Sequence, residues 1–208
     1  MDHSVPSSSH NSVPRGLNYG CGERLLADCL NVDARPPQAT LLPPSFLQHN
    51  ATDPLPFPTD SLEFVFAQHF IEHIPLKSGI VWLTEVLRVL KPGGIVRLST
   101  PDLRRHAEGY LSGCTTYQAQ SKNYLSQWTA HPPDRPAWRL NQLFQFWGHS
   151  WIYDREELLY LAQRAGFQTI VFQSFGRSLD PRLGALDSPD REWESLYVDL
   201  RKLNHSKL

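Results

Sequence analysis

The sequence predicts an α/β fold built on an open, mostly parallel sheet, and three observations lead to it. A short apolar run ends in two glycines, Gly20 and Gly22, separated by one residue. A second run ends in a carboxylate, Asp33. Over residues 62–99 a strand pattern, a helical pattern and another strand pattern follow one another, which indicates a βαβ unit with a right-handed crossover. A strand, a glycine turn and an acid ending the next strand are typical of nucleoside binding in such sheets.

Length and composition favour one domain, because a single core is ordinary for 208 residues. We expect residues 1–14, rich in Ser, His, Asn and Pro, to be a disordered lead-in, and residues 15–208 to form the domain. The net charge of −1 provides no basic field for phosphates, so a nucleic-acid partner is unlikely. An apolar run of about 18 residues is missing, so we expect no membrane span. With no signal peptide and no disulfide spacing among three cysteines, a cytoplasmic protein is expected.

The first half of the chain is expected to supply four strands, at residues 15–19, 29–33, 45–50 and 62–68. Residues 23–28 leave room for little more than one helical turn between the first two strands. In a dinucleotide-binding unit three glycines open a full helix here, so the spacing argues against NAD. Apolar residues recur at helical spacing over 76–90, and Lys91-Pro92-Gly93-Gly94 is expected to end that helix.

The second half of the chain adds elements that cover and complete the sheet. They are strands at 95–99, 167–172 and 194–200, helices at 103–111 and 117–128, and a helix from Asp154, its N-cap, to Ala165. The last two strands are expected to pair antiparallel. Residues 131–136 form a proline-rich break, and the aromatic segment at 141–151 has two interpretations. Core packing is the favoured one, and a substrate pocket is the other.

Four motifs occur in order along the chain: Leu17-Asn18-Tyr19-Gly20-Cys21-Gly22 with Asn31-Val32-Asp33, Pro54-Leu55-Pro56-Phe57 with Asp60-Ser61, Glu72-His73-Ile74, and Glu85 to Gly94. Together they resemble the class I S-adenosylmethionine-dependent methyltransferases, and in particular the methyltransferase type 11-like group. The resemblance runs from residue 15 to residue 203. It implies a Rossmann-like, doubly wound sheet of seven strands, mostly parallel with an antiparallel last strand. It also implies S-adenosylmethionine as the cofactor.

The same resemblance implies a cofactor site at the ends of the first strands. Gly20 and Gly22 would lie under the methionine part, and Asp33 would hold the ribose hydroxyls. Asn50 stands where the family often has Asp near the adenine amine, and its side-chain carbonyl can still accept from that amine. The complete set of expected cofactor contacts is Asn18, Gly20, Cys21, Gly22, Asp33, Asn50, Ala51, Gln68 and His69.

Histidines are the candidates for chemistry on the acceptor, because an unperturbed imidazole titrates at a pKa of about 6.5. His69, at the methionine end of the cofactor with Gln68, and His149 are candidates for a base that lines an acceptor pocket. A structural role is the favoured interpretation of each histidine taken singly. The nine histidines lack a spacing such as HExxH, so we expect no metal.

The function that these motifs favour is in-line methyl transfer from S-adenosylmethionine to a small-molecule acceptor. The acceptor atom, an oxygen, nitrogen, sulfur or carbon, is left open, and no oligomeric state follows from the motifs. A non-catalytic module that keeps the fold, and with it cofactor binding or an assembly role, is the alternative. A nicotinamide-dependent oxidoreductase is disfavoured by the short spacing from Gly22 to Asp33 and by the missing third glycine.

Overall fold

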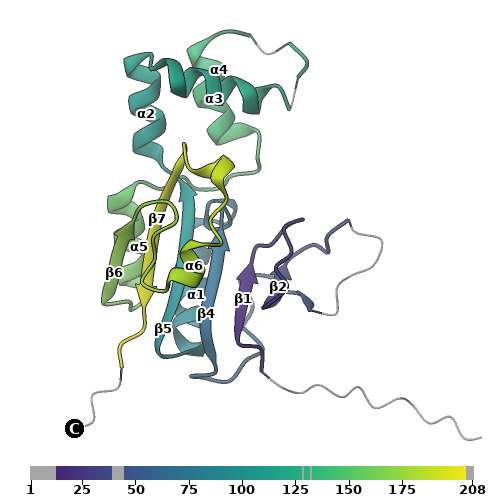
Figure 1. Ribbon diagram of the computed structural model, residues 1–208, viewed down its shortest axis with the longest axis vertical. Helices are drawn as coiled ribbons and strands as arrows, with labels where there is room; N and C mark the ends of the chain where they lie inside the picture. The colour runs from purple at the N-terminus through teal and green to yellow at the C-terminus, as the bar shows by residue number, and fades with distance from the viewer. Residues whose placement is uncertain (1–12, 39–44, 128, 132, 205–208) are drawn as a thin grey trace, which may run out of the picture.

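The computed structural model describes residues 13–38, 45–127, 129–131 and 133–204 (Figure 1). Its sheet holds seven strands in the order β3-β2-β1-β4-β5-β7-β6. The strands are β1 (Gly16–Tyr19), β2 (Leu30–Asp33), β3 (Phe46–Gln48), β4 (Leu62–Gln68), β5 (Leu90–Pro101), β6 (Thr169–Gln173) and β7 (Ser195–Arg201). β7 runs antiparallel to its neighbours β5 and β6, and the pairs among β1 to β5 are parallel. The predicted fold class is therefore confirmed.

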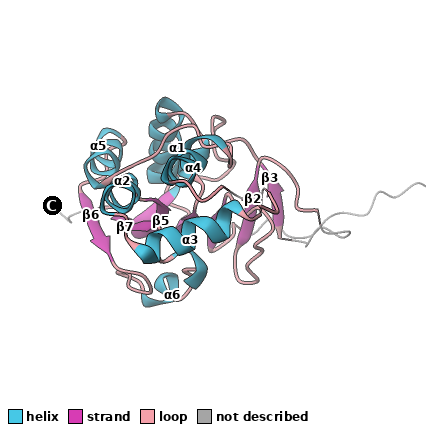
Figure 2. Cartoon of the chain, turned by 90° about the horizontal axis from the view of Figure 1, so that it is seen from above, coloured by secondary structure: helices cyan, strands magenta, loops and turns pink. Residues whose placement is uncertain are grey.

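The helices fall into two groups, those that flank the sheet and those that stand beyond its carboxyl edge. They are α1 (Leu76–Val89), α2 (Leu103–Ser112), α3 (Thr115–Leu125), α4 (Pro136–Gln145), α5 (Arg155–Arg164) and α6 (Pro181–Gly184), with 3-10 turns η1 (Ile71–His73) and η2 (Pro189–Arg191). Seen from above, α1 and α5 lie on one side of the sheet and α6 on the other (Figure 2). Helices α2, α3 and α4 contact one another and stand beyond the carboxyl end of β5, where they form what we call the helical cap (Figure 1).

The main core lies between the sheet and helices α1 and α5. Strand side chains alternate between the two faces, so Leu17, Val65 and Val96 all point toward this core. From α1, Leu83 and Val86 enter the same core at helical spacing, and each is fully buried. This packing fixes the strand ends, and thereby the loops that follow them at the carboxyl edge.

The opposite face of the sheet carries a buried ion network. Arg97 of β5 is 0% exposed, and its guanidinium lies 2.5 Å from an Asp187 oxygen and 3.2 Å from an Asp199 oxygen. The same guanidinium lies 4.9 Å from the centre of the Tyr197 ring. Asp199 lies opposite Arg97 in β7, whereas Asp187 belongs to the segment that follows α6. The network thus ties that segment to the sheet.

Several local predictions differ from the structure. Helix α1 ends at Val89, and Lys91 to Gly94 already belong to β5, because Gly93 takes a φ of +80° and donates its N–H to the Lys202 carbonyl at 3.0 Å. Helix α4 was not predicted, since Pro136 was assigned to a break; proline is tolerated at a first helical position. The core interpretation of the aromatic segment is wrong for Phe144 and Trp151, which are 41% and 42% exposed.

The predicted domain boundaries, a lead-in at 1–14 and one domain at 15–208, stay predictions. Residues 1–12 of that lead-in lie outside the described residues. The predicted antiparallel pairing of the last two strands is confirmed, with Phe172 of β6 opposite Val198 of β7.

We expect Arg97→Met to lower the free energy of unfolding by about 3–5 kcal/mol, because it leaves two buried carboxylates without their cation. Arg104 offers a matched control, since it pairs with Glu108 on the surface and both side chains are more than half exposed. Arg104→Ala should change stability by less than about 1 kcal/mol. Urea unfolding at neutral pH measures both variants, and a similar small change in both would contradict this account of the network.

Candidate active site

A cleft of about 550 Å³ opens at the carboxyl ends of β1, β2 and β4. Its walls come from the turn after β1, the end of β2, the loop after β3 and the segment from His69 to Ser78. Six of the residues predicted to contact a cofactor line it: Gly20, Gly22, Asp33, Asn50, Ala51 and His69. The structure therefore brings together residues that lie up to 49 positions apart in the sequence.

The glycine turn needs both of its glycines. Gly20 and Gly22 have φ values of +69° and +50°, in the left-handed region that glycine enters without a Cβ clash. A Cβ on Gly20 would also lie 2.5 Å from the Phe70 side chain. The Gly22 N–H donates to an Asp33 oxygen at 2.9 Å, and the Arg35 N–H donates to the other at 3.1 Å. Each carboxylate oxygen can accept more than one bond, so Asp33 is held in place and can still accept from a ligand.

A second cavity, of about 300 Å³, lies on the other side of the glycine turn. It is lined by the remaining predicted contacts Asn18, Cys21 and Gln68, and it shares Gly20 and His69 with the large cleft. Burial raises the pKa of the Cys21 thiol to about 11, so Cys21 contributes a protonated, unreactive side chain. Asn18 donates to the Asn31 side chain at 2.8 Å and thereby fixes this part of the floor.

Arg24 is a residue of this second cavity that the sequence did not point to. Residues 23–28 form turns and no helix, so no helix N-terminus faces the glycine turn. Arg24 fills the position instead: it donates to the Gln68 side-chain oxygen at 2.7 Å and to the Leu186 carbonyl at 2.5 Å. A cation thus stands where open α/β sheets usually present the positive end of a helix dipole.

A third and smaller cavity, of about 140 Å³, lies under the helical cap. It is lined by His69, Glu72, His73, Pro101, His106, Tyr124, Gln142, Leu143, Trp147, His149, Arg191, Trp193 and Glu194. Trp147 and His73 also line the large cleft, so the two spaces adjoin. His69 lines all three cavities and therefore lies at their junction.

His69 is held in a strained backbone conformation at the end of β4. Its φ is +50°, which is rare for a residue other than glycine and is found most often at functional sites. Its ring Nε2 lies 2.7 Å from the Ser195 hydroxyl, whose own proton goes to the Arg191 carbonyl at 2.6 Å. Nε2 must therefore donate, and the Nδ1 lone pair faces the Glu72 carboxyl at 3.4 Å. Burial lowers the pKa of His69 to about 3, so the ring is neutral.

Glu72 is a fully buried carboxyl in the wall of the small cavity. One of its oxygens accepts from the Thr100 hydroxyl at 3.1 Å, whereas the other, Oε1, has no hydrogen-bond partner. Burial raises the pKa of Glu72 to about 8. Its backbone carbonyl accepts from the N–H groups of Ser150 and Trp151 at 2.6 and 3.1 Å, which fastens the loop after α4 to η1.

His149 comes from that fastened loop. Its Nδ1 donates to the Leu143 carbonyl at 2.5 Å, so the lone pair remains on Nε2. Burial lowers the pKa of His149 to about 4 and keeps the ring neutral. The ring stands edge-on to His73, with their centres 4.9 Å apart. Both histidines predicted as candidate bases, His69 and His149, thus line the small cavity.

Three further residues of the small cavity escaped the sequence analysis. Glu194 lies 2.9 Å from Arg191, and a carboxylate oxygen of Glu194 lies 3.7 Å from Nε2 of the buried His106. No local pattern marks Arg191 or Glu194, because they follow α6 and reach the cavity only through the return of the chain to β7. His106 lies on α2 and is 2% exposed, so the helix turns this side chain inward.

A family model described as "Methyltransferase domain" matches residues 4–171, which is most of the chain. The chain belongs to this methyltransferase family. It is accordingly an enzyme that uses S-adenosylmethionine as its cofactor. The cofactor predicted from the sequence motifs is thereby confirmed, whereas the individual contact residues stay predictions.

Solved structures of methyltransferases share the fold of this methyltransferase. A possible histamine N-methyltransferase from Thermotoga maritima has a TM-score of 0.51 and 18% identity over 90% of this chain and 81% of that one. A Methanosarcina mazei methyltransferase has the same TM-score and identity over 94% and 97% of the two chains. One from Archaeoglobus fulgidus has a TM-score of 0.53 and 13% identity over 90% and 86%. The chain spans only 45% of a matched Bordetella parapertussis structure. No curated protein matched the sequence.

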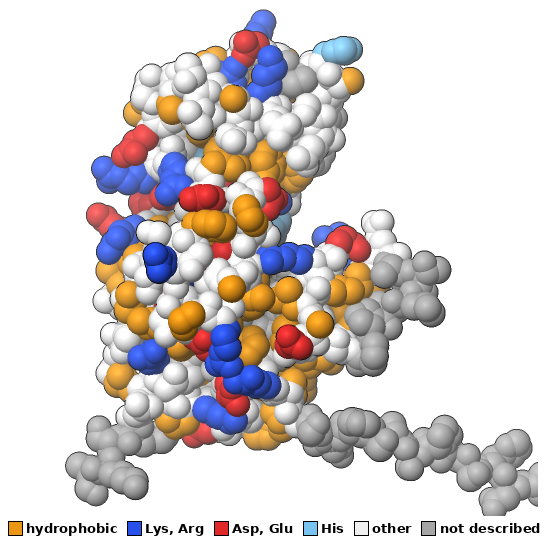
Figure 3. Space-filling model, in the orientation of Figure 1, with side chains coloured by type: hydrophobic (Ala, Val, Ile, Leu, Met, Phe, Trp, Pro, Cys, Tyr) orange, Lys and Arg blue, Asp and Glu red, His pale blue; other side chains and the backbone are white. Residues whose placement is uncertain are grey.

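The outer surface adds two observations. Acidic and basic side chains lie side by side on the face drawn in Figure 3, and they form no continuous basic patch among the described residues seen there. Within the described part of the chain, every helix is too short or too polar to cross a bilayer.

The Glu194 carboxylate predicts a pH dependence of stability. Burial acts to raise its pKa, but His106, His69 and Arg191 outweigh this and lower the pKa to about 2. A carboxyl whose folded-state pKa lies below its unfolded value of about 4.3 stabilises the fold above that pH. The stabilisation is lost as the pH falls toward 2. We therefore expect the stability difference between wild type and Glu194→Gln to be constant above about pH 5 and to shrink between about pH 5 and pH 2.

Chemical unfolding of both proteins across this pH range measures that difference. Glu192→Gln is the matched control, because Glu192 belongs to the same segment and is exposed outside the small cavity. A difference between wild type and Glu194→Gln that stays constant down to pH 2.5 would contradict the prediction.

Proposed function

We propose that this methyltransferase transfers the methyl group of S-adenosylmethionine to a small, uncharged acceptor in the 140 Å³ cavity under the helical cap. The observation that supports this most directly is the junction at His69. There a large cleft with nucleoside-binding features meets a small cavity. In-line displacement needs the nucleophile, the methyl carbon and the sulfur on one line, and adjoining cavities provide that alignment.

The cofactor fits the two larger cavities in one orientation. Adenosine would occupy the large cleft, with its ribose hydroxyls donating to Asp33 and its adenine near Asn50 and Ala51. Asn50 uses its amide nitrogen toward Asp53 at 3.4 Å, so its carbonyl oxygen keeps its capacity to accept from the adenine amine. The methionine tail would pass Gly20 into the second cavity, where the guanidinium of Arg24 would hold the carboxylate.

The small cavity limits the acceptor to about one ring. A protein cavity of about 150 Å³ holds a molecule the size of benzene. Arg191 and Glu194 pair with each other at 2.9 Å, burial keeps His69 and His149 neutral, and burial raises the pKa of Glu72 to about 8, which favours its neutral form. A charged acceptor group would therefore have no unpaired counter-charge among these residues. An uncharged phenol, amine or imidazole of one ring fits both limits.

Methyl transfer itself requires little acid–base catalysis from the protein. The acceptor lone pair attacks the methyl carbon, the carbon–sulfur bond breaks, and its electrons neutralise the sulfonium. Holding the reactants in this geometry supplies several kcal/mol of the barrier reduction. A hydroxyl acceptor also loses its proton, and His69 or His149 can take it through a free ring nitrogen. The two histidines remain candidate bases in this proposal.

A binding experiment with two ligands tests the cofactor orientation. S-adenosylhomocysteine carries the amino-acid tail, and 5′-methylthioadenosine lacks it. Asp33→Asn should weaken both ligands by about tenfold or more, because a charge-assisted hydrogen bond to the ribose is lost. Arg24→Gln should weaken only S-adenosylhomocysteine, by about tenfold or more, since methylthioadenosine has no carboxylate. Asp28→Asn, in the same connection and outside the cavity walls, should change neither.

Isothermal titration calorimetry measures all eight combinations of protein and ligand. Equal losses of both ligands in Arg24→Gln would contradict the placement of the tail. No binding of either ligand to the wild type at millimolar concentration would overturn the cofactor site.

A turnover experiment tests methyl transfer and the size limit. With S-adenosylmethionine, one-ring phenols, amines and imidazoles are expected to give acceptor-dependent S-adenosylhomocysteine, and their two-ring analogues at least about tenfold lower kcat/KM. Trp147→Ala should relax this selectivity, because Trp147 lines the small cavity. Phe144→Ala, on an exposed side chain of the same segment, should not. Cofactor binding without product from any acceptor would favour the non-catalytic module instead.

A further inference from the structure

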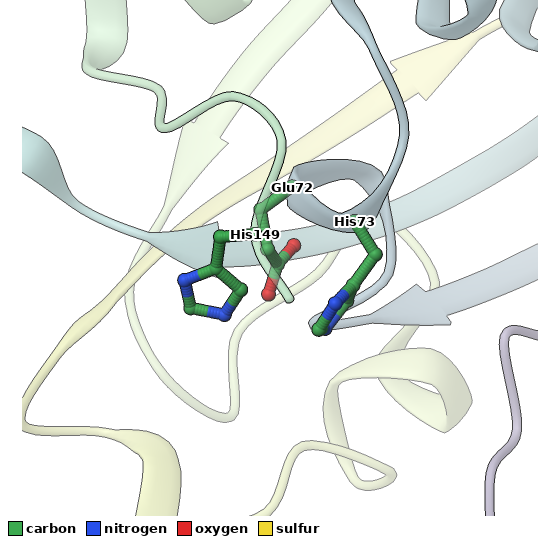
Figure 4. A group of neighbouring side chains, drawn as sticks. All are labelled: Glu72, His73 and His149. Carbon is green, nitrogen blue, oxygen red and sulfur yellow. The ribbon is translucent and has the colours of Figure 1, made fainter. Parts of the chain in front are cut away.

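We propose that Glu72, His73 and His149 form a binding site for a divalent first-row transition metal, in the wall of the small cavity. One potential ligand atom from each of the three residues lies within 4.8 Å of the other two. Figure 4 shows the Glu72 carboxylate between the two imidazole rings. Glu72 and His73 come from η1, whereas His149 comes from the loop after α4, so the fold brings the cluster together from two places.

Each histidine has one ring nitrogen engaged and the other available. His149 donates from Nδ1 to the Leu143 carbonyl, and His73 is hydrogen-bonded to the Gly148 carbonyl. A backbone carbonyl that holds one imidazole N–H fixes the tautomer, orients the ring and leaves the opposite lone pair for a metal. Both histidines therefore already make the backbone hydrogen bond that metal-bound histidines typically make.

Glu72 supplies a carboxyl ligand that would lose its proton on binding a metal, and one of its oxygens lacks a hydrogen-bond partner. Its side chain is 0% exposed, and Oε1 makes no hydrogen bond to any described residue. A buried carboxylate oxygen without a donor is costly, and a bound cation removes that cost by supplying positive charge. The unpaired atom belongs to the carboxylate that lies between the two imidazoles (Figure 4).

The cluster is also held together before any metal arrives. The Glu72 carbonyl accepts from the Ser150 and Trp151 N–H groups, and the Ser150 hydroxyl donates to the His73 carbonyl at 3.0 Å. Gly148, with a φ of +73°, provides the left-handed turn that presents His149 to η1. These bonds run between segments about 77 residues apart, so the relative placement of the three ligands is built into the fold.

The ligand set favours zinc or cobalt(II) over magnesium or calcium. Imidazole nitrogen suits first-row transition metals, whereas magnesium and calcium prefer oxygen ligands. Ligand atoms at about 2.1 Å from one tetrahedral metal lie about 3.4 Å apart, so small side-chain rotations close the cluster. Three protein ligands leave a position open. Toward the small cavity that position would hold an acceptor oxygen or nitrogen; this role rests on the proposed function, whereas metal binding does not. With the Nε2 lone pair of His149 on the metal, His69 alone of the two histidines would remain a candidate base.

No spacing in the sequence indicates this cluster, and the expectation of no metal is the hypothesis that competes with it. That expectation rested on the lack of an HExxH spacing. Here two ligands are adjacent in the sequence and the third lies 76 positions after His73, so a search for local spacing passes over them. The hydrogen bonds of Ser150 and Trp151 to the Glu72 carbonyl, and of Ser150 to the His73 carbonyl, bring His149 into reach.

Metal binding to the chelator-treated full-length protein, without cofactor or acceptor, tests the proposal. Titration calorimetry with zinc, cobalt(II), manganese(II) and magnesium is expected to give one equivalent of a transition metal, bound more tightly than magnesium. His149→Ala and Glu72→Gln should each weaken the metal by at least about tenfold, because each removes a ligand. His131→Ala, which removes an exposed histidine remote from the cluster in sequence, should leave the affinity unchanged.

Thermal unfolding of each variant, with and without metal, separates lost ligands from lost folding. The metal should raise the unfolding midpoint of wild type and of His131→Ala. It should not raise that of His149→Ala, whose midpoint without metal should equal that of wild type. If Glu72→Gln fails to fold, metal binding to His149→Ala still tests the proposal, because His149 is partly exposed. Absence of binding, equal binding in His149→Ala, or tighter magnesium binding would overturn the proposal. None of these outcomes depends on methyl transfer, so the two proposals fail separately.

Discussion

The arrangement of the cavities depends on one buried carboxyl, Glu72. Its side chain accepts from Thr100 on β5, its backbone carbonyl accepts from Ser150, and its free oxygen faces His69. Strand β5, the loop after α4 and the end of β4 therefore meet at one fully buried residue. Because burying an ionisable group is costly, its neighbours must match its charge state closely. The same burial keeps its neighbours His69 and His149 neutral.

The sequence predicted the parts of the site that depend on local order along the chain. Gly20, Gly22 and Asp33 lie at strand ends, and the alternation and spacing of the strands place them at the same edge of the sheet. The parallel order and the antiparallel β7 followed from the resemblance that the ordered motifs carried. His69 was found because it ends β4, and the end of a parallel strand is where such folds place their ligands.

What the sequence could not predict depends on pairings across long distances in the chain. Arg24 is an exposed residue, and its contacts with Gln68 and Leu186 depend on the missing crossover helix and on a segment 162 positions later in the chain. Arg191 and Glu194 sit in a segment with no periodicity. An aromatic residue such as Trp147 or Phe144 is compatible with either a core or a pocket position. Its hydrophobicity alone does not indicate the direction in which the side chain points. The cap supplies that direction, and its helix α4 was hidden by a proline at its first turn.

The protonation state of Glu72 also determines whether Nδ1 of His69 has a hydrogen-bond donor, whatever molecule occupies the small cavity. With Nε2 donating to Ser195, Nδ1 presents a lone pair to the Glu72 carboxyl at 3.4 Å. A protonated Glu72 satisfies both groups, because its proton lies between two acceptors. An ionised Glu72 would place two lone pairs against each other, so a positive charge must come between them or beside them. A proton on Glu72 therefore suits His69, and the same proton would have to leave before the carboxyl could serve the proposed metal as an anionic ligand.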